Sequence, residues 1–348
     1  MISPWTPDRD ELAAELAGQP RYRIDQLWRG LYTEGLAPAD VTSLPKALRH
    51  DLGRRYGPEL SPAKRQSSHD GSTEKWLFSM ADGAAIETVL MHYPRRSTVC
   101  VSSQAGCAMA CAFCATGQAG YRRNLTVGQI LEQVMAARAA AGERRVSNVV
   151  FMGMGEPLAN YDRVVTAVRR LINDVGLAAR HITVSTIGLV PRIDQLAGEG
   201  LQIGLAVSLH AADDESRRAL VPINRRHPID ELMAACRRYR ELTGRRVSLE
   251  WAMIDAVNDR PVDAERLAGL ARSARAHVNL IPLNPTPGWP TVGSPPARIT
   301  RFADQLRAEG VNVTVRANRG VDIDAACGQL ATGHRATPVT MVPTGPAG

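Results

Sequence analysis

The sequence predicts an α/β protein: a partial (βα)6 barrel of the TIM type, preceded by a helical accessory domain and a β-hairpin extension. Three observations support this class. From residue 98, short apolar runs alternate with helix-period segments, six such units follow one another, and polar motifs end the apolar runs. Six units are too few for a closed eight-stranded barrel. The 348 residues suffice for a barrel with appendages.

The segments before the alternation predict two smaller parts. Residues 1–65 contain short helical segments with polar joints, of which residues 22–32 have the clearest apolar face. Residues 66–97 contain two strand-like runs, 74–80 and 85–93, separated by a turn typical of hairpins. We therefore expect a helical accessory domain at residues 1–65 and a β-hairpin extension at residues 66–97.

Residues 98–330 carry the alternation of strands and helices. The predicted strands are residues 99–102, 148–152, 181–185, 203–208, 247–254 and 277–281. The predicted helices are Val127–Ala141, Tyr161–Asn173, 191–198, Ile229–Thr243, 262–274 and 297–309. A last strand at residues 312–317 leads into a loop that contains a cysteine. Residues 331–348, rich in Thr, Pro and Gly, predict a flexible tail.

The charge of the chain favours a polyanionic partner. The net charge is +7 and the pI is about 9.3, although nearly all the positive charge is Arg, which codon composition also explains. No apolar run approaches the length of a membrane span, and the first residues lack the blocks of a secretory signal, so we expect a cytoplasmic protein without a membrane partner. Candidate phosphate contacts, with solvated helix faces as the alternative, are the Arg pairs at 95/96, 122/123, 225/226 and 245/246.

Three of the six cysteines, Cys107, Cys111 and Cys114, form a CxxxCxxC motif. In a cytosolic protein such a motif indicates metal binding rather than a disulfide framework. Three thiolates hold three irons of a [4Fe–4S] cluster and leave the fourth iron open for another ligand. Structural zinc takes four ligands, and no fourth Cys or His lies nearby in the sequence. The iron–sulfur interpretation is therefore favoured over zinc.

Polar motifs follow the predicted strands at their carboxyl ends, where barrels build active sites. Taken alone, each has an ordinary interpretation, such as a turn glycine or a structural histidine. Together on one edge of the sheet they predict a ligand pocket. In chain order, these residues are Gly155, Glu156, Ser185, Ser208, Leu209, His210 and Asn284.

The cysteine motif followed by a (βα) pattern resembles the radical S-adenosylmethionine (SAM) superfamily over about residues 98–317. The runs at 99–107, 151–160 and 322–330 are similar to the dual-specificity rRNA and tRNA adenine-C2 methyltransferases, and the resemblance covers nearly the whole chain. It implies a [4Fe–4S] cluster on the three cysteines, SAM bound by the strand-end residues, and methylation of adenine C2 in 23S rRNA and tRNA. We also expect an RNA-binding role for the helical domain, an electron donor such as flavodoxin, and a monomer.

The same resemblance implies roles for two further cysteines and a glutamate. Adenine C2 carries no lone pair, so the family uses a radical route that consumes two SAM molecules per turnover. Cys327 corresponds to the residue that carries the methyl group as S-methylcysteine, and Cys100 to the residue that releases the product by forming a disulfide with it. Glu87 corresponds to the base that removes the C2 proton. Without the resemblance, Cys100 in its β-run is best explained as a small core residue, whereas a packing role is less natural for Cys327 in its Gly- and Ala-rich loop. Glu87 is equally consistent with a solvent-facing position on a strand.

Three alternatives remain at this point. A paralogous class methylates C8 of adenine and shares the cluster and both additional cysteines, although Pro157 weakly favours the C2 class. Radical SAM enzymes of other chemistry, such as glycyl-radical activases, have no use for the pair Cys100 and Cys327. A zinc protein that only binds RNA is the third alternative. Cys236 lies within the predicted helix Ile229–Thr243, and we expect it to be structural.

Overall fold

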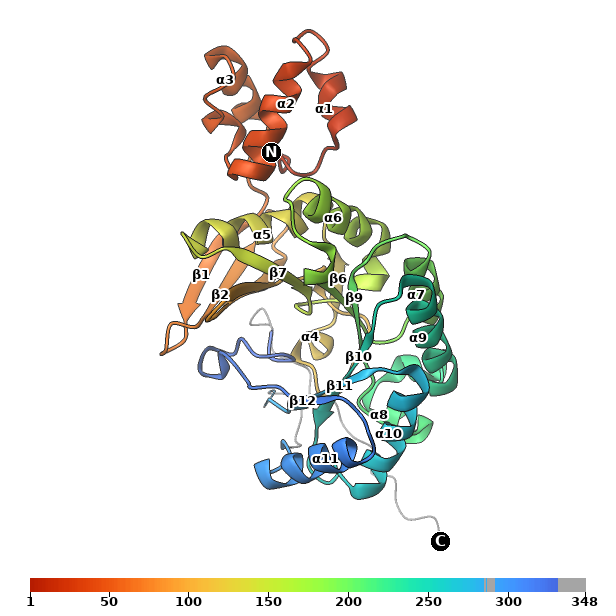
Figure 1. Ribbon diagram of the computed structural model, residues 1–348. Helices are drawn as coiled ribbons and strands as arrows, with labels where there is room; N and C mark the ends of the chain where they lie inside the picture. The colour runs from red at the N-terminus through yellow and green to blue at the C-terminus, as the bar shows by residue number, and fades with distance from the viewer. Residues whose placement is uncertain (285, 287–291, 331–348) are drawn as a thin grey trace.

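A curved, mixed β-sheet forms the centre of the computed structural model, which describes residues 1–284, 286 and 292–330 (Figure 1). In sheet order, the strands are β1 (Ser61–Ser67), β2 (Thr73–Ser79), β3 (Ala85–Tyr93), β4 (Arg96–Cys100), β7 (Val146–Phe151), β8 (Ile182–Thr186), β9 (Gly204–Ser208), β10 (Val247–Met253), β11 (His277–Pro282) and β12 (Val313–Val315). Pairing is antiparallel from β1 to β4 and parallel from β4 to β12. The predicted α/β class with a partial barrel is confirmed, whereas the predicted tail at 331–348 lies outside the described residues.

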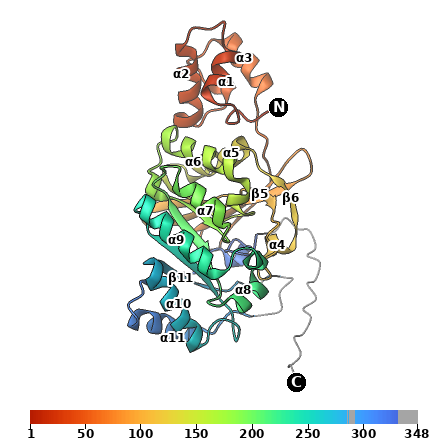
Figure 2. The ribbon, with the colours of Figure 1, turned by 90° about the vertical axis from the view of Figure 1, so that its right-hand side faces the viewer.

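Helices cover the outer face of the parallel strands (Figure 2). They are α5 (Val127–Ala141), α6 (Tyr161–Asn173), α7 (Val190–Ala197), α9 (Ile229–Thr243), α10 (Pro261–Ala274) and α11 (Pro296–Ala308). The short helix α8 (Asp214–Leu220) instead contacts the turns at the carboxyl ends of β8 and β9. Helices α5, α6 and α9 have the predicted bounds, and α8 was not predicted. Helices α10 and α11 start one residue earlier than predicted, at a proline, because the fixed φ of proline suits the first helical position.

The barrel strands alternate between two environments. Trp251 on β10 is fully buried beneath the helices, with its ring centroid 6.1 Å from that of Phe302 on α11. Its neighbours Glu250 and Ala252 point the other way and line the interior of the barrel. In the described part of the chain β12 pairs with β11 alone, so the barrel is open between β12 and the antiparallel strands.

The antiparallel strands correct two predicted boundaries. Strand β1 starts at Ser61 and crosses the predicted limit at residue 65; its exposed, charged residues lack the apolar alternation that would have revealed an edge strand. Strand β4 starts at Arg96 instead of residue 99, because a tight turn leads directly from β3 into antiparallel pairing with it. Since β4 also pairs with β7, the extension is continuous with the barrel sheet.

Short helices precede β1 and lie above α5 and α6 (Figure 1). They are α1 (Arg9–Glu15), α2 (Tyr22–Arg29), a π-helical turn (Gly30–Glu34) and α3 (Lys46–Arg55). Arg170 on α6 fastens this part to the barrel by donating to the carbonyl oxygens of Trp5 and Thr6 and to the Tyr32 hydroxyl. The described residues include no helix that is long and apolar enough to cross a membrane.

Candidate functional site

A cavity of about 160 Å³ lies inside the barrel at the carboxyl ends of the parallel strands. Ten of the thirteen predicted site residues line it: Cys107, Cys111, Cys114, Gly155, Glu156, Ser185, Ser208, His210, Asn284 and Cys327. The other three, Glu87, Cys100 and Leu209, do not. The Leu209 side chain is fully buried in the hydrophobic core because it alternates with its two inward-facing neighbours.

The cysteine motif occupies a loop between two short strands, β5 (Gln104–Gly106) and β6 (Tyr121–Asn124), and ends in the short helix α4 (Ala115–Gln118). Burial raises the pKa of Cys107 to about 12 and that of Cys111 well above its usual value, so neither thiol ionises at pH 7 without a cation. Within the described ranges, no three Cys, His, Asp or Glu residues are grouped to hold one metal ion. The three thiols instead share a cavity wall, and this donor set fits a [4Fe–4S] cluster, which takes one thiolate per iron.

Glu156 is a buried carboxylate in this cavity wall. Its Oε2 accepts from the backbone N–H of Ile187 at 2.9 Å, and its Oε1 accepts from that of Leu158 at 3.1 Å. Burial raises its pKa to about 7 despite these bonds. Gly155 precedes it with φ +97°, and a Cβ there would lie 2.5 Å from the side chain of Gln104. The glycine therefore permits the close packing that holds the carboxylate in place.

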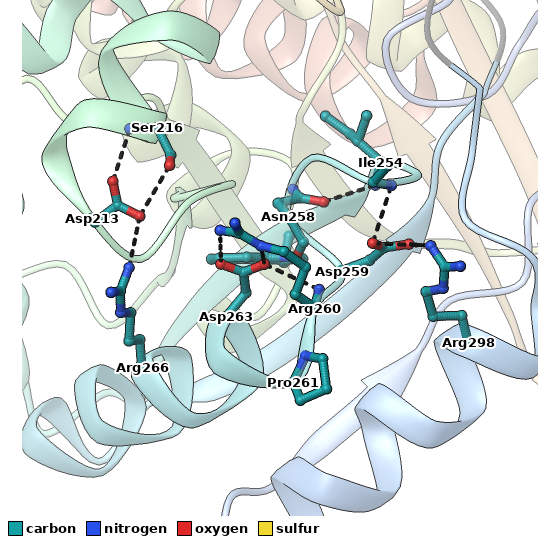
Figure 3. A network of polar contacts seen from close by, with 12 residues as sticks. Asp213, Ser216, Ile254, Asn258, Asp259, Arg260, Pro261, Asp263, Arg266 and Arg298 are labelled. Carbon is teal, nitrogen blue, oxygen red and sulfur yellow. Dashed lines mark hydrogen bonds and ion pairs between the residues drawn. The ribbon is translucent and has the colours of Figure 1, made fainter. Parts of the chain in front are cut away.

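His210 faces the cavity from a strained turn with φ +60°. Its Nδ1 accepts from the backbone N–H of Ala252 at 3.0 Å, and its carbonyl oxygen accepts from Asn258 at 2.7 Å. Asn258 also accepts from the Ile254 N–H, and the ion pair of Asp259 with Arg298 secures the same loop (Figure 3). Burial lowers the pKa of His210 to about 3, so the imidazole is neutral.

The depressed pKa of His210 predicts a pH effect on stability. The unfolded state binds a proton at His210 below pH about 6.5 and the folded state only near pH 3, so the free energy of unfolding falls as the pH falls between these values. From pH 6.5 to 5 this loss is about 2 kcal/mol. Asparagine tolerates the positive φ at this position, so His210→Asn should fold. Between pH 6.5 and 5, the free energy of unfolding of its apoprotein, measured by urea denaturation, should fall by about 2 kcal/mol less than that of the wild type. Equal losses in both proteins would contradict the assignment.

Cys327 lies in a loop that several parts of the barrel hold. Ala115, directly after the cysteine motif, donates to the Gly328 carbonyl at 2.9 Å. Asn284 donates to the Cys327 carbonyl at 3.2 Å, and Lys75 on β2 donates to that of Asp324 at 3.0 Å. Figure 1 shows this segment beside α4 within the curve of the sheet. The loop therefore brings Cys327 to the cavity, where the residue remains exposed.

A second cavity, of about 480 Å³, adjoins the first. Cys100 and Cys327 both line it, and Cys327 lines the two cavities together. All six cysteines are free thiols, so the structure contains no disulfide between these two. Burial raises the pKa of the Cys100 thiol, and desolvation by the surrounding cavity walls raises that of Cys327. The described lining includes Arg96, Arg316 and Arg319 but no carboxylate, which favours an anionic ligand.

Glu87 lies next to this second cavity rather than in solvent. It is 4% exposed and follows the same strand face as Val89 and Met91, which line the cavity. Its Oε1 is 3.0 Å from the ammonium of Lys75, the residue that also holds the Asp324 carbonyl. A single lysine thus joins the predicted base to the loop of Cys327.

Sequence reasoning did not identify Lys75, Arg316 or Glu250 as site residues. Arg316 and Glu250 line the smaller cavity with a 3.6 Å ion pair, and Lys75 contacts Glu87. No spacing or motif distinguishes these residues from other charged positions. Of the predicted phosphate contacts, Arg96 lines the second cavity, whereas Arg123 forms an ion pair with Asp82.

Three cysteines in one loop and polar strand ends around a shared cavity, all on a partial (βα) barrel, define a radical SAM enzyme. Residues 101–268 match the family described as the Radical SAM superfamily. A probable dual-specificity RNA methyltransferase RlmN of Parafrankia sp. is 52% identical, with 93% of this chain and 89% of the relative covered. One of Rhodococcus erythropolis is 50% identical, with 93% and 92% covered. The solved structure of a radical SAM methyltransferase from Sphaerobacter thermophilus has 52% identity and a TM-score of 0.91, with 95% and 99% covered. The chain belongs to the RlmN family of dual-specificity RNA methyltransferases.

Proposed function

We propose that this protein methylates C2 of adenine in 23S rRNA and tRNA through an S-methylcysteine at Cys327, with two SAM molecules per turnover. The observation that carries the proposal is the position of Cys327, which lines both the cavity of the cysteine motif and the cavity of Cys100. A methyl carrier needs access to the methyl donor on one side and to the acceptor on the other. The family of the chain supports RNA as the acceptor.

The smaller cavity is the proposed SAM site. Cys107, Cys111 and Cys114 would hold the cluster, whose open iron leaves room for the amino and carboxylate groups of SAM. When bound, the cluster and SAM together supply a 5′-deoxyadenosyl radical. The Glu156 carboxylate would accept from the SAM ammonium. Further SAM contacts would come from Gly155, Ser185, Ser208, His210 and Asn284, with Leu209 contributing only backbone.

The larger cavity is the proposed site of the target adenine. Cys327 would attack the methyl group of the first SAM: a carbon–sulfur bond forms at its Sγ, the bond from the methyl group to the sulfonium breaks, S-adenosylhomocysteine leaves and the thiol proton is lost. The radical derived from the second SAM would take a hydrogen atom from that methyl group, and the resulting methylene radical would add to C2. The adduct would return one electron to the oxidised cluster, and Glu87 would remove the C2 proton, a role supported by its burial on the cavity face of β3. Cys100 would then attack the Cys327 sulfur: the disulfide forms, the bond from that sulfur to the methyl-derived carbon breaks, and the carbon takes up a proton to complete the methyl group. A thiol reductant would restore both cysteines before the next turnover. Both thiols line this cavity, which supports the pairing.

The partners follow from the same assignment. The three arginines of the larger cavity suit the phosphates of an RNA loop whose adenine is turned outward. The helical part that precedes β1 is the proposed RNA-binding domain, strands β1 to β3 form the extension, and the sheet from β4 to β12 with its helices forms the catalytic barrel. A flavodoxin-type donor would supply the electron for SAM cleavage. We propose that the enzyme acts as a monomer in the cytoplasm.

The position of methylation tests the proposal. Anaerobically reconstituted protein is incubated with a reductant, SAM carrying a deuterated methyl group, and RNA from a strain that lacks the modification. Digestion and mass spectrometry against both standards should detect labelled 2-methyladenosine, because the acceptor is C2. Labelled 8-methyladenosine would assign the protein to the paralogous C8 class, and the absence of label from RNA would contradict both.

A further inference from the structure

A fully buried arginine holds two residues, Ile187 and Ser208, that line the smaller cavity. Arg217 is on α8, and its side chain has 0% exposure. The guanidinium donates to the carbonyl oxygens of Ile187 at 2.6 Å, Leu209 at 3.1 Å and Ser208 at 3.2 Å. Its Nη1 donates to Asn224 Oδ1 at 2.8 Å. Arg217 thus joins the two turns, after β8 and β9, from which the proposed SAM contacts project.

The charge of Arg217 has no direct anionic partner among the described residues. All four bonds end on neutral oxygens, and the Asp214 carboxylate contacts the group only through the Asn224 amide. Burial lowers the pKa of Arg217 to about 10, so it remains charged at pH 7. Burying a cation without a counter-charge lowers the stability of the folded state. This unpaired cation lies beside the proposed cluster site.

The cysteine loop packs directly on the helix that carries this cation. The Ala112 N–H donates to the carbonyl of Leu220, the last residue of α8, at 3.1 Å. Cys111 packs against the same small core as Leu220. Asp213 fixes the start of α8 by accepting from the Ser216 N–H at 2.8 Å and by pairing with Arg266 (Figure 3). Of the ionisable groups around the guanidinium, Cys111, Asp214 and Cys236 raise its pKa, and it lowers the pKa of His210.

We infer that Arg217 is a positioning residue that supplies the counter-charge of the iron–sulfur cluster and stabilises its reduced form. The inference rests on the cluster named in the proposed function and extends it. Three thiolates give a [4Fe–4S]²⁺ cluster a net charge of about −1, and reduction adds one more negative charge. A fixed cation therefore favours the reduced state, which is the state that cleaves SAM. The neutral oxygens that hold the guanidinium keep its charge available for this purpose.

The test measures the reduction potential of the cluster, not the activity. Protein reconstituted with iron and sulfide is titrated anaerobically in the absence of SAM and followed by electron paramagnetic resonance. Arg217→Met removes the charge but keeps the length of the side chain. Asn224→Asp keeps Arg217 and adds a carboxylate next to it. Both variants should shift the equilibrium towards the oxidised cluster by at least about tenfold, which is ~59 mV for one electron.

Arg170→Met is the matched control, since Arg170 is also buried and bonded to carbonyl oxygens but belongs to α6 and the amino-terminal segment. It should lower stability and leave the potential unchanged. If Arg217→Met does not fold, Asn224→Asp decides the question. A wild-type potential in either variant overturns the inference while leaving the proposed function intact. A wild-type protein that takes up no cluster overturns both.

Discussion

Replacing Cys107, Cys111 or Cys114 with alanine abolishes the formation of 5′-deoxyadenosine under dithionite. Each substitution removes one of three thiolates. The only other cysteine in the described part of the cavity wall is Cys327, and its loop is held in place by the hydrogen bond from Ala115 to Gly328, so it cannot replace the lost ligand. An incompletely held cluster is lost or inactive. The measurement is the yield of 5′-deoxyadenosine per folded protein, with iron and sulfide content determined on the same samples. A reduction to background is expected for all three variants.

Cys236→Ala is the control for this series. Cys236 is fully buried on α9 and lines neither cavity, so its loss should affect stability while the yield per folded protein persists. If any of the three motif variants produces 5′-deoxyadenosine at the wild-type yield, the cluster assignment is wrong. Zinc bound at full occupancy without a cluster absorbance band would favour the RNA-binding alternative.

Replacing Cys327 or Cys100 singly with alanine stops the reaction at two different steps. Cys327→Ala has no sulfur to receive the first methyl group, so it forms no S-methylcysteine and leaves RNA free of protein. Cys100→Ala still accepts the methyl group and still adds to adenine, but it lacks the thiol that breaks the bond between protein and RNA. A covalent protein–RNA adduct therefore accumulates. A denaturing gel of each variant purified from cells, with and without ribonuclease, distinguishes the two.

The double variant provides the internal check. Cys100→Ala combined with Cys327→Ala should show no adduct, because the bond to RNA requires Cys327. An adduct that persists in the double variant would place the attachment on another residue. If Cys100→Ala remains free of RNA and retains full methylation activity, Cys100 has no resolving role and is a core residue, as its 7% exposure alone would suggest.

The barrel could be predicted because each of its units carries its own local pattern. Helices α5, α6 and α9 begin and end where their apolar periodicity does, and a Thr126–Gln129 capping box marks the start of α5. The parallel strands are buried apolar runs between these helices, and their carboxyl ends meet on one edge by topology alone. Ten site residues therefore converge as expected, although they come from segments up to 220 positions apart, from Cys107 to Cys327.

The remaining features depend on tertiary contacts that leave no local pattern. Strands β5 and β6 are three and four residues long and are stable only because they pair across the cysteine loop. Arg217 and Lys75 are single charged residues in the sequence. Each holds a site segment by donating to carbonyl groups that are distant along the chain, and no local pattern reveals this role. Strand β1 is polar along its length and is recognised only through its pairing with β2.

The opening of the barrel between β12 and the antiparallel strands affects how a polymer such as RNA reaches the larger cavity. Strands β3 and β4 line one wall of the larger cavity and β11 and β12 line the other, with no pairing between β4 and β12 in the described chain. A closed ring would admit a nucleotide only from its end and would require a long strand to double back or thread. An incomplete ring imposes no such topological condition. Here side-chain contacts span the gap, since Lys75 on β2 holds the Asp324 carbonyl and Arg319 donates to the His92 carbonyl on β3. Opening this side therefore costs a few side-chain hydrogen bonds, whereas opening a closed ring would break a whole ladder of backbone bonds.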